Sequence, residues 1–296
     1  MAATVIYGKD LARELRNSLS HTLERLKGKG IVPGLTVVLV GDDPASDSYV
    51  RGKEKACLEL GMVSNTLRFP ESMAQDGLLE LISRLNLDDS VDGILVQVPL
   101  PKHMDTDLVL RTIDPAKDVD GFHPVSIGKL LLGQETFISC TPHGVVKILE
   151  KTGMPLAGLE VVVVGRSNIV GKPMAMLLMQ APHHCTVTVC HTRTLDLKAH
   201  TLRADIVIVA AGKPRMVTAD MIRPGACVID VGVNRVPDAS KASGFALVGD
   251  IDYVPIAEKA SFVTPVPGGV GPMTITMLMV NTVKAACLRR GLAVEN

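Results

Sequence analysis

A run of four valines, Val161–Val164, ends directly at Gly165, and this feature most constrains what the chain can fold into. A continuous β-branched run is typical of a strand that is buried on both faces of a parallel sheet. The apolar segment after Pro173 favours a helix, because proline fits the first helical turn. A strand, a glycine turn and a helix together form a common site for a nucleotide pyrophosphate, which is attracted by free main-chain N–H groups and by the helix dipole.

The glycine spacing of this turn departs from the G-x-G-x-x-G dinucleotide fingerprint. Ser167 and Val170 stand where the second and third glycines would be, and the next glycine is Gly171. A tight strand–helix turn in an ordinary α/β protein is therefore an equally good interpretation of this stretch alone. Motifs elsewhere in the chain are needed to distinguish a nucleotide site from an ordinary strand–helix turn.

The chain of 296 residues is long enough for two domains, each with its own core. A hydrophobic content of 47% and a charged content of 21% exclude a disordered protein, and 31 basic residues balance 31 acidic ones. We therefore expect no nucleic-acid partner and no polybasic membrane surface. No apolar run reaches membrane-spanning length, and the N-terminal sequence lacks the layout of a secretory signal.

The six cysteines of the chain include no C-x-x-C pair. Most of them lie in apolar runs, where a free cysteine behaves as a small hydrophobic residue. A reducing compartment fits this pattern best, so we expect a cytoplasmic protein. We expect no metal site, because His, Asp and Glu do not cluster at ligand spacing.

Hydrophobic periodicity predicts alternating strands and helices in the first half of the chain. Strands are expected at residues 35–41, 63–69 and 93–98, and helices at residues 8–27, 44–60, 78–87 and 105–113. Asp43–Pro44 offers an N-cap followed by proline in the first helical turn, and Gly61 offers a helix stop. The pattern loosens over residues 114–141, and DPAKDVDGFHP at 114–124 contains too many turn formers for a regular element. A helix is expected from Thr141 to Leu149.

The second half repeats the alternation in the manner of a dinucleotide-binding sheet. Strands are expected at residues 159–164, 187–190, 206–212, 228–231, 246–248 and 261–264, and later helices at 197–203 and 273–290. The sequence thus predicts an α/β fold with two domains, each an open, mostly parallel sheet with flanking helices, and the second of Rossmann type. We place the first domain at residues 1–141 plus the C-terminal helix 273–296, and the second at 142–272. The last helix is long enough to protrude from a compact sheet, so we expect it to pack back on the first domain.

Tyr49 and Lys53 stand four residues apart on the helix predicted after the first buried strand, so they share a helix face. An aromatic ring can stack on a planar substrate, and a lysine amine is a tunable acid or base. A solvated helix face is the alternative, which the neighbouring Glu54 and Lys55 support. Gly52 in the same helix costs about 1 kcal/mol relative to alanine. The close approach of another backbone or of a ligand would explain this glycine.

Three polar residues at the ends of the next elements are further candidates. Gln97 interrupts an apolar strand end, where a buried amide needs partners and where ligand sites of parallel sheets lie. It serves either a ligand or a nearby main-chain group. Asp118 and Asp120 lie in a turn, and turn aspartates usually bind their own backbone.

The expected second strand of the nucleotide unit ends at Cys190 and is followed by His191, Thr192 and Arg193. An NAD site usually places an acidic residue here, on the ribose 2′-hydroxyl, and this stretch has none. Arg166 in the first turn can reach the same corner, and a guanidinium suits a 2′-phosphate. We therefore favour NADP over NAD as the cofactor. His191 is either part of this corner of the site or an ordinary histidine at a strand end.

The segment Thr264–Thr274 reads TPVPGGVGPMT and is too rich in glycine and proline for a regular element. It either connects to the last helix or forms part of a site, because Gly268 and Gly269 allow main chain to approach a ligand closely.

Five motifs together resemble those of the bifunctional methylenetetrahydrofolate dehydrogenase/cyclohydrolases. They are YVRGKEK from Tyr49, VQVPLP from Val96, KDVDGF from Lys117, GRSNIVGKP from Gly165 and the Thr264–Thr274 segment. The resemblance covers nearly the whole chain, and its last two motifs are long and specific, whereas Y-x-x-x-K alone is not.

The resemblance implies a folate-binding catalytic domain, an NADP-binding domain and a cleft between them. It implies an enzyme of one-carbon metabolism and purine biosynthesis that oxidises 5,10-methylenetetrahydrofolate with NADP and hydrolyses the methenyl product to 10-formyltetrahydrofolate. The expected partners are tetrahydrofolate one-carbon derivatives and a second copy of the chain, since members of the family are usually homodimers joined through the nucleotide domain.

The resemblance also implies a role for each motif residue. Lys53 would activate water or polarise the one-carbon bridge, and Gln97 would orient and tune Lys53. Tyr49 would stack on the aromatic part of the folate, and Asp120 would hold the N–H groups of the pterin. The implied substrate contacts are Tyr49, Val50, Arg51, Gly52, Lys53, Val96, Gln97, Val98, Asp120, Pro267, Gly268, Gly269, Val270 and Gly271. The implied cofactor contacts are Gly165, Arg166, Ser167, Thr192 and Val233.

One position departs from the family pattern, because Thr192 stands where serine is frequent and Arg193 follows it. Some mitochondrial relatives use NAD with phosphate and magnesium and place an arginine near this corner, so NAD is the alternative cofactor. The alternative functions are a dehydrogenase that has lost the hydrolase step and a non-catalytic nucleotide- or folate-binding protein. The presence of Lys53 argues against both.

Overall fold

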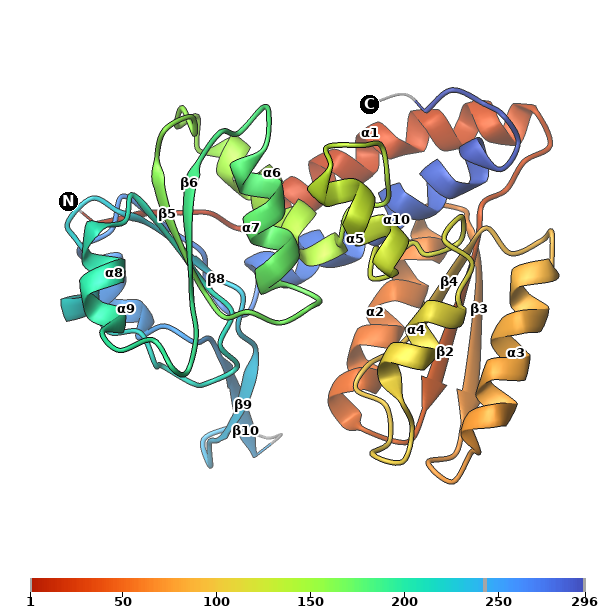
Figure 1. Ribbon diagram of the computed structural model, residues 1–296, viewed down its shortest axis with the longest axis horizontal. Coiled ribbons are helices and arrows are strands. Elements are labelled where there is room, and N and C mark those ends of the chain that lie inside the picture. The colour runs from red at the N-terminus through yellow and green to blue at the C-terminus, as the bar shows by residue number, and fades with distance from the viewer. Residues whose placement is uncertain (1, 242–243, 295–296) are drawn as a thin grey trace. The chain divides into compact units, whose positions relative to one another are not determined.

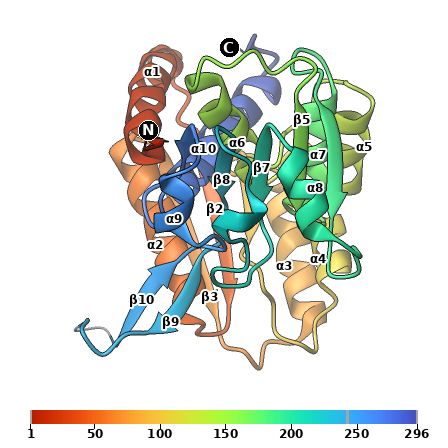
Figure 2. The same ribbon diagram turned by 90° about the vertical axis from the view of Figure 1, so that its left-hand side faces the viewer.

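The computed structural model describes residues 2–241 and 244–294. The chain divides into two compact units by its internal contacts. The first unit comprises the residues up to Arg13 and the segment Thr141–Thr274, and the second comprises Glu14–Cys140 and the residues from Ile275 onward. Each unit has its own parallel sheet, and most of the strands are labelled in Figures 1 and 2.

The second unit is built on a three-stranded sheet in the order β3-β2-β4, and all its strands are parallel. The strands are β2 (Gly34–Val40), β3 (Val63–Phe69) and β4 (Gly93–Val96). Its helices include α2 (Pro44–Glu59), α3 (Gln75–Leu87), α4 (Thr106–Thr112) and α5 (Pro124–Leu131). The central strand β2 is buried along its whole length, as its mostly apolar sequence predicts.

The start and the end of α2 follow the predicted signals. The side chain of Asp43 accepts a hydrogen bond of 2.8 Å from the main-chain N–H of Ser46, and Pro44 occupies the first turn. Gly61 follows the helix with a φ angle of +68°, in the left-handed region that favours glycine. These caps confirm the predicted limits of the helix that carries Tyr49 and Lys53.

The turn-rich stretch at residues 114–124 ends where α5 begins, and this helix is the regular element within the loose pattern of residues 114–141. Pro124 occupies the first turn of this helix, and a ring nitrogen of His123 accepts a hydrogen bond of 3.0 Å from the N–H of Val125. The turn formers therefore end at a proline that starts a helix.

The first unit is built on a six-stranded parallel sheet in the order β1-β11-β8-β7-β5-β6. The strands are β1 (Thr4–Val5), β5 (Glu160–Val164), β6 (Thr186–Cys190), β7 (Ile206–Val209), β8 (Cys227–Asp230) and β11 (Phe262–Val263). A separate antiparallel hairpin consists of β9 (Asn234–Pro237) and β10 (Phe245–Val248), visible in Figure 2. Its helices include α6 (Cys140–Lys151), α7 (Gly171–Met179), α8 (Leu197–Arg203), the 3-10 turn η1 (Ala219–Met221) and α9 (Tyr253–Ala257).

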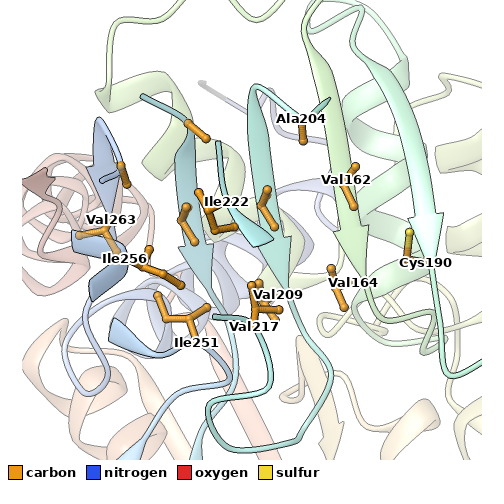
Figure 3. Close-up of a cluster of buried hydrophobic side chains, with 14 residues drawn as sticks. Val162, Val164, Cys190, Ala204, Val209, Val217, Ile222, Ile251, Ile256 and Val263 are labelled. Atoms are coloured by element: carbon orange, nitrogen blue, oxygen red, sulfur yellow. The ribbon is translucent and has the colours of Figure 1, made fainter. Parts of the chain in front are cut away.

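The four valines of β5 occupy the interior of this sheet, and none is more than 3% exposed. Val162 and Val164 belong to one buried cluster with Val209 and Val217 (Figure 3). The strand order reverses beside β5, because β6 follows on one side and β7 on the other. Ligands of open α/β sheets bind at such a switch point, outside the carboxyl ends of the strands. The Rossmann-type sheet predicted from the valine run is confirmed.

The N-terminal residues join the first unit, whereas the predicted limits place them with residues 14–141. The physical reason is strand pairing: β1 lies parallel to β11, with Thr4 opposite Phe262, and the N–H of Ile6 donates to the oxygen of Val263 at 2.9 Å. A strand of two residues carries too little pattern for a prediction. The predicted domain limits at Met1 and Asn296 lie outside the described residues.

Helix α10 (Val270–Leu288) begins in the first unit and continues into the second, and helix α1 (Gly8–Gly28) does the same. Asn281 of α10 donates to the main-chain oxygens of Val119 and Ile138 at 2.8 and 2.9 Å. After the helix ends, Arg289 donates to the buried Asp92 at 2.9 Å. These contacts join the last helix and the residues after it to the first half of the chain.

Among the described residues, no helix combines the length and the apolar character needed to cross a membrane.

Candidate functional site

The side chains of Lys53 and Gln97 contact each other at the carboxyl end of the three-stranded sheet. Lys53 lies in α2, which follows β2, and Gln97 comes directly after β4. Lys53 Nζ donates a hydrogen bond of 2.9 Å to Gln97 Oε1, and Gln97 Nε2 donates to the main-chain oxygen of Val98 at 2.8 Å. Gln97 thus serves both the lysine and a neighbouring main-chain group, and the second bond orients its amide oxygen toward the amine.

Lys53 is 7% exposed, which is unusual for a lysine. Burial lowers the pKa of its amine, while the charge of Asp120 acts in the opposite direction. A lysine with a lowered pKa exchanges its proton closer to neutral pH than an exposed one. The predicted alternative of a solvated helix face is excluded for Lys53, whereas Lys55 on the same helix has a side chain that is 78% exposed.

Asp120 lies close enough to Lys53 for their charges to interact. Burial raises the pKa of Asp120, and the positive charge of Lys53 and a hydrogen bond with the Cys140 side chain oppose this change. Cys140 is 1% exposed, and burial raises the pKa of its thiol well above the usual range. The site therefore holds one amine, one carboxyl group and one neutral thiol in a largely dry environment.

The two aspartates of the KDVDGF turn have different partners. Asp118 accepts hydrogen bonds from the N–H groups of Phe122 and His123 at 3.2 and 2.8 Å, and from the hydroxyl of Ser126 at 2.8 Å. Burial raises the pKa of Asp118 to about 7. Asp118 thus binds its own turn, as expected for a turn aspartate, and leaves Asp120 as the carboxyl group beside Lys53.

Tyr49 precedes Lys53 by one turn of α2 and is partly buried, and burial raises the pKa of its hydroxyl group. A Cβ atom added to Gly52 would lie 3.1 Å from Cδ1 of Ile275 in α10. A packed side chain, and not a neighbouring backbone, therefore accounts for the glycine in this helix. Arg51 forms an ion pair of 2.7 Å with Asp47, and its side chain is 73% exposed.

Two of the expected substrate contacts have side chains in the core of the second unit. Val50 is 0% exposed and Val96 is 2% exposed, and Val96 belongs to the apolar cluster that packs around β4. A ligand can reach these two residues only through their main-chain atoms. Val98 is partly buried, and its oxygen is the acceptor that orients Gln97.

The turn after β5 presents main-chain donors beside the start of α7. Gly165 has a φ angle of +127°, and a Cβ atom there would collide with the oxygen of Ala210. The hydroxyl of Ser167 accepts from the N–H groups of Val170 and Gly171 at 3.1 and 3.4 Å, so it stabilises the turn that leads into α7. Within the described part of the chain, the N–H groups of residues 166–169 have no acceptor. These four donors lie in the turn between β5 and the start of α7, where they fit an anionic phosphate group.

The corner after β6 carries no carboxylate between His191 and Thr194. His191 is occupied by its own turn, because its Nδ1 accepts a hydrogen bond of 3.1 Å from the N–H of Arg193. The nearest following acid, Asp196, caps α8 by accepting from Ala199 at 3.0 Å. Thr192 is exposed directly after the strand. The corner therefore offers hydroxyl and guanidinium donors in place of the acid of a typical NAD site.

Arg166, Val233 and the segment Pro267–Gly271 are the other predicted ligand residues, and all lie in the first unit. Arg166 is exposed, and Val233 is 43% exposed between β8 and β9. Gly268 has a φ angle of +100° with open space around its Cα, and its oxygen accepts from the N–H of Lys9 at 3.2 Å. The segment is thus a shaped loop that leads into the first turn of α10.

Two buried aspartates at the sheet edge of the first unit were missed from the sequence. Asp230 ends β8 and is 2% exposed, and Asp250 follows β10 and is 0% exposed. Each accepts several main-chain N–H groups, and burial raises the pKa of Asp230 to about 6. In the sequence, each of these aspartates is marked only by its position within or shortly after an apolar run.

Two family profiles together match most of the chain. The catalytic domain of tetrahydrofolate dehydrogenase/cyclohydrolase matches residues 6–120, and the NAD(P)-binding domain of the same family matches residues 139–290. The bifunctional protein FolD of Bacillus pumilus is 56% identical over 286 residues, which cover 97% of this chain and 98% of that protein.

Two solved structures of high similarity cover nearly the whole chain. The bifunctional enzyme FolD of Campylobacter jejuni, a methylenetetrahydrofolate dehydrogenase/cyclohydrolase, is 49% identical with a TM-score of 0.92, over 97% of this chain and 100% of that one. The methylenetetrahydrofolate dehydrogenase-cyclohydrolase of Trypanosoma brucei, complexed with NADP cofactor and inhibitor, is 37% identical with a TM-score of 0.94, over 99% of this chain and 100% of that one. The chain therefore belongs to the tetrahydrofolate dehydrogenase/cyclohydrolase family.

Proposed function

We propose that this chain is a bifunctional enzyme of one-carbon metabolism. It oxidises 5,10-methylenetetrahydrofolate to the methenyl form with NADP, and it hydrolyses the methenyl form to 10-formyltetrahydrofolate. The observation that carries this proposal is the hydrogen bond between the buried Lys53 and Gln97, beside the carboxyl group of Asp120. A binding protein has no need for a buried amine with a lowered pKa, because such a group costs stability.

In this proposal, each unit binds one of the two small molecules. The second unit, which carries Lys53, Gln97 and Asp120, binds the folate, and the first unit binds NADP. The ranges of the two family profiles support the division, since one profile ends at residue 120 and the other starts at residue 139. We also assign main-chain contacts with the folate to Pro267–Gly271, because the open space at Gly268 allows close approach.

In the oxidation step, bound NADP accepts the hydride that leaves the methylene carbon with its electron pair. The protein's part is to bind and orient. The free N–H groups of residues 166–169 hold phosphate oxygens, and the exposed Val233 borders the nicotinamide. Tyr49 stacks on the aromatic part of the folate, and Asp120 accepts hydrogen bonds from the N–H groups of the pterin.

In the hydrolysis step, a water molecule adds to the methenyl carbon and Lys53 takes a proton from it. The carbon–nitrogen bond on one side of the bridge then breaks. The released nitrogen takes one proton, the formyl group stays on the other nitrogen, and one proton leaves to solvent. The lowered pKa of Lys53 favours the neutral amine that this step needs, and Gln97 holds the amine in place.

NADP is the cofactor that the nucleotide corner fits. Thr192, Arg193 and Arg166 are exposed there, and none of them forms an ion pair within the described residues. A guanidinium pairs with a phosphate through charged hydrogen bonds, whereas an NAD site would place a carboxylate on the 2′-hydroxyl. Arg166 therefore discriminates in favour of the 2′-phosphate.

We further propose a cytoplasmic homodimer joined through the first unit. All six cysteines are free and buried, which suits a reducing compartment. Strand β6 is an edge strand, and its Val189 is 36% exposed, so main-chain and apolar groups are available for a second copy. Light scattering of the purified protein should give twice the chain mass of 31.5 kDa, and the mass of one chain would contradict the dimer.

One spectroscopic experiment tests the activity. The protein is mixed with NADP and methylenetetrahydrofolate while the absorbance of NADPH and of the methenyl product is followed. We expect NADPH to form with little accumulation of the methenyl form. A lack of NADPH would contradict the enzyme, and NADPH with no hydrolysis of added methenyltetrahydrofolate would leave only a dehydrogenase.

A further inference from the structure

We propose that Asp250 is a positioning residue for the dehydrogenase reaction, because its buried carboxylate holds together the loops after β7 and β8 on which NADP rests. The inference depends on the proposed NADP site of the first unit. All the residues involved belong to that unit.

Asp250 reaches both loops with its two oxygens. Oδ2 accepts hydrogen bonds from the N–H groups of Ala211 and Gly212 at 2.7 and 2.8 Å, in the loop after β7. Oδ1 accepts a hydrogen bond of 2.8 Å from Nδ2 of Asn234, at the end of the loop after β8. The side chain is 0% exposed, so water does not compete for these bonds.

The loop that Asp250 holds is the one that packs against the phosphate turn. The N–H of Ala210 donates to the oxygen of Val164 at 2.8 Å, and the oxygen of Ala210 faces Gly165 so closely that a Cβ atom there would collide with it. The loop after β7 and the turn after β5 therefore meet at the switch point of the sheet, where the cofactor binds. A shift of Ala211 and Gly212 would move one wall of that site.

A second buried aspartate fixes Asp250 in turn. Asp230 accepts from the N–H of Asp250 at 2.9 Å through Oδ1, and from the N–H of Ile251 at 3.2 Å through Oδ2. Oδ1 also accepts from the N–H of Gly232 at 3.1 Å. The N–H of Asp230 itself donates to Oγ1 of Thr264 at 2.8 Å. A continuous chain of hydrogen bonds thus joins the ends of β7, β8, β10 and β11.

The space around the two carboxylates is fully used. A Cβ atom added to Gly232 would collide with the carboxyl group of Asp250, and one added to Gly249 would collide with that of Asp230. Both neighbours are therefore glycines because the carboxylates occupy the space of a side chain. Such a packed network positions main chain more accurately than a solvated loop does.

The side chain of residue 250 must accept hydrogen bonds and must not itself present a donor. All three groups that reach it are N–H donors, from Ala211, Gly212 and Asn234. An asparagine there has the same shape, but its NH₂ group would face one of these donors. The result is an unsatisfied donor and a displaced loop, whereas the fold of the sheet is kept.

The test is Asp250→Asn in the full chain, with NADP binding measured by calorimetry and both reactions measured by absorbance. We expect the dissociation constant and the KM for NADP to rise about tenfold, because a buried donor is left unpaired. Hydrolysis of added methenyltetrahydrofolate needs no NADP and takes place at Lys53, so it should stay within about twofold. Asn234→Ala removes one partner of Asp250 and should weaken NADP binding in the same direction by a smaller factor.

Asp252→Asn is the matched control, since Asp252 lies two residues away and its side chain makes no capping hydrogen bond. It should leave NADP binding unchanged. Wild-type affinity for NADP in Asp250→Asn would overturn the proposal. Parallel loss of NADP binding, of hydrolysis and of thermal stability in both Asp250→Asn and Asn234→Ala would also overturn it, in favour of a purely structural role. Failure of the wild-type chain to reduce NADP would instead refute the proposed function.

Discussion

Lys53 Nζ lies 2.9 Å from Gln97 Oε1, and a second hydrogen bond from the same glutamine to the oxygen of Val98 holds that amide in one orientation. The amine is buried, has a neutral hydrogen-bond partner and lies near the carboxyl group of Asp120. The amide orients Lys53 without holding it in its charged form, as a carboxylate partner would. This arrangement leaves the amine able to take and return a proton.

Lys53→Met should abolish hydrolysis of methenyltetrahydrofolate while NADP binding is kept. The amine is the group that takes the water proton, and such a group contributes about a hundredfold to ten-thousandfold in rate. Lys55→Met is the control, because Lys55 lies on the same helix with an exposed side chain and should leave hydrolysis unchanged. Near-normal hydrolysis in Lys53→Met would remove Lys53 from the mechanism.

Gln97→Glu should move the pH dependence of hydrolysis to higher pH. A carboxylate at hydrogen-bond distance stabilises the charged amine and raises the pKa of Lys53, by about one to three units for a close pair. Less neutral amine is then present at a given pH, so the rising limb of the rate profile shifts upward. The exposed Gln134→Glu is the control. Identical profiles for Gln97→Glu and the wild type would show that Lys53 is not the titrating group.

Arg166→Ala should raise the KM for NADP far more than the KM for NAD. The guanidinium is exposed beside the phosphate turn, and a lost hydrogen bond between charged groups costs about tenfold or more in affinity. Arg84→Ala in the exposed part of α3 should affect neither value. Equal effects of Arg166→Ala on the two cofactors would mean that Arg166 does not contact the 2′-phosphate.

Asp118 should make the free energy of unfolding fall as the pH rises from about 4 to about 7. Burial raises its folded-state pKa from 3.8 to about 7, so in this range the folded chain holds a proton that the unfolded chain has released. The contribution is at most about 1.4 kcal/mol per pH unit. Denaturant titrations of the wild type and of Asp118→Asn at several pH values measure it.

In Asp118→Asn, the free energy of unfolding should lose the part of its pH dependence that Asp118 contributes. Asp76→Asn, at an exposed position in the first turn of α3, serves as the control and should keep the wild-type slope. A slope that is the same in the wild type and in Asp118→Asn would show that the carboxyl group of Asp118 is already ionised over this range.

The elements that the sequence predicts well are those whose signal is local. Val161–Val164 predicts a buried strand because four β-branched residues in succession fit little else, and Asp43–Pro44 predicts a helix start because both residues act on the next turn. The resemblance to a family directed attention to Lys53 and Gln97, which the structure brings into contact although they stand far apart in the sequence. Without the resemblance, a solvated helix face was the favoured interpretation of Tyr49 and Lys53.

The features that escaped prediction depend on partners that are distant in the sequence. Strand β1 has two residues and exists through its pairing with β11. Asp230 and Asp250 have no motif of their own, because the main-chain donors that surround them are gathered only by the closed sheet. Gly52 is explained by the side chain of Ile275, which no local pattern indicates.

The pairing of β1 with β11 bears on how the chain folds as it is synthesised. Thr4 and Val5 are made long before the strand that they pair with, Phe262–Val263. The second unit also combines early and late residues. Asn281 of α10 donates hydrogen bonds to the main-chain oxygens of Val119 and Ile138, which lie in the first half of the chain. Each unit is assembled from an early and a late segment of the chain, so domain-by-domain folding during translation is not open to this chain in its simple form.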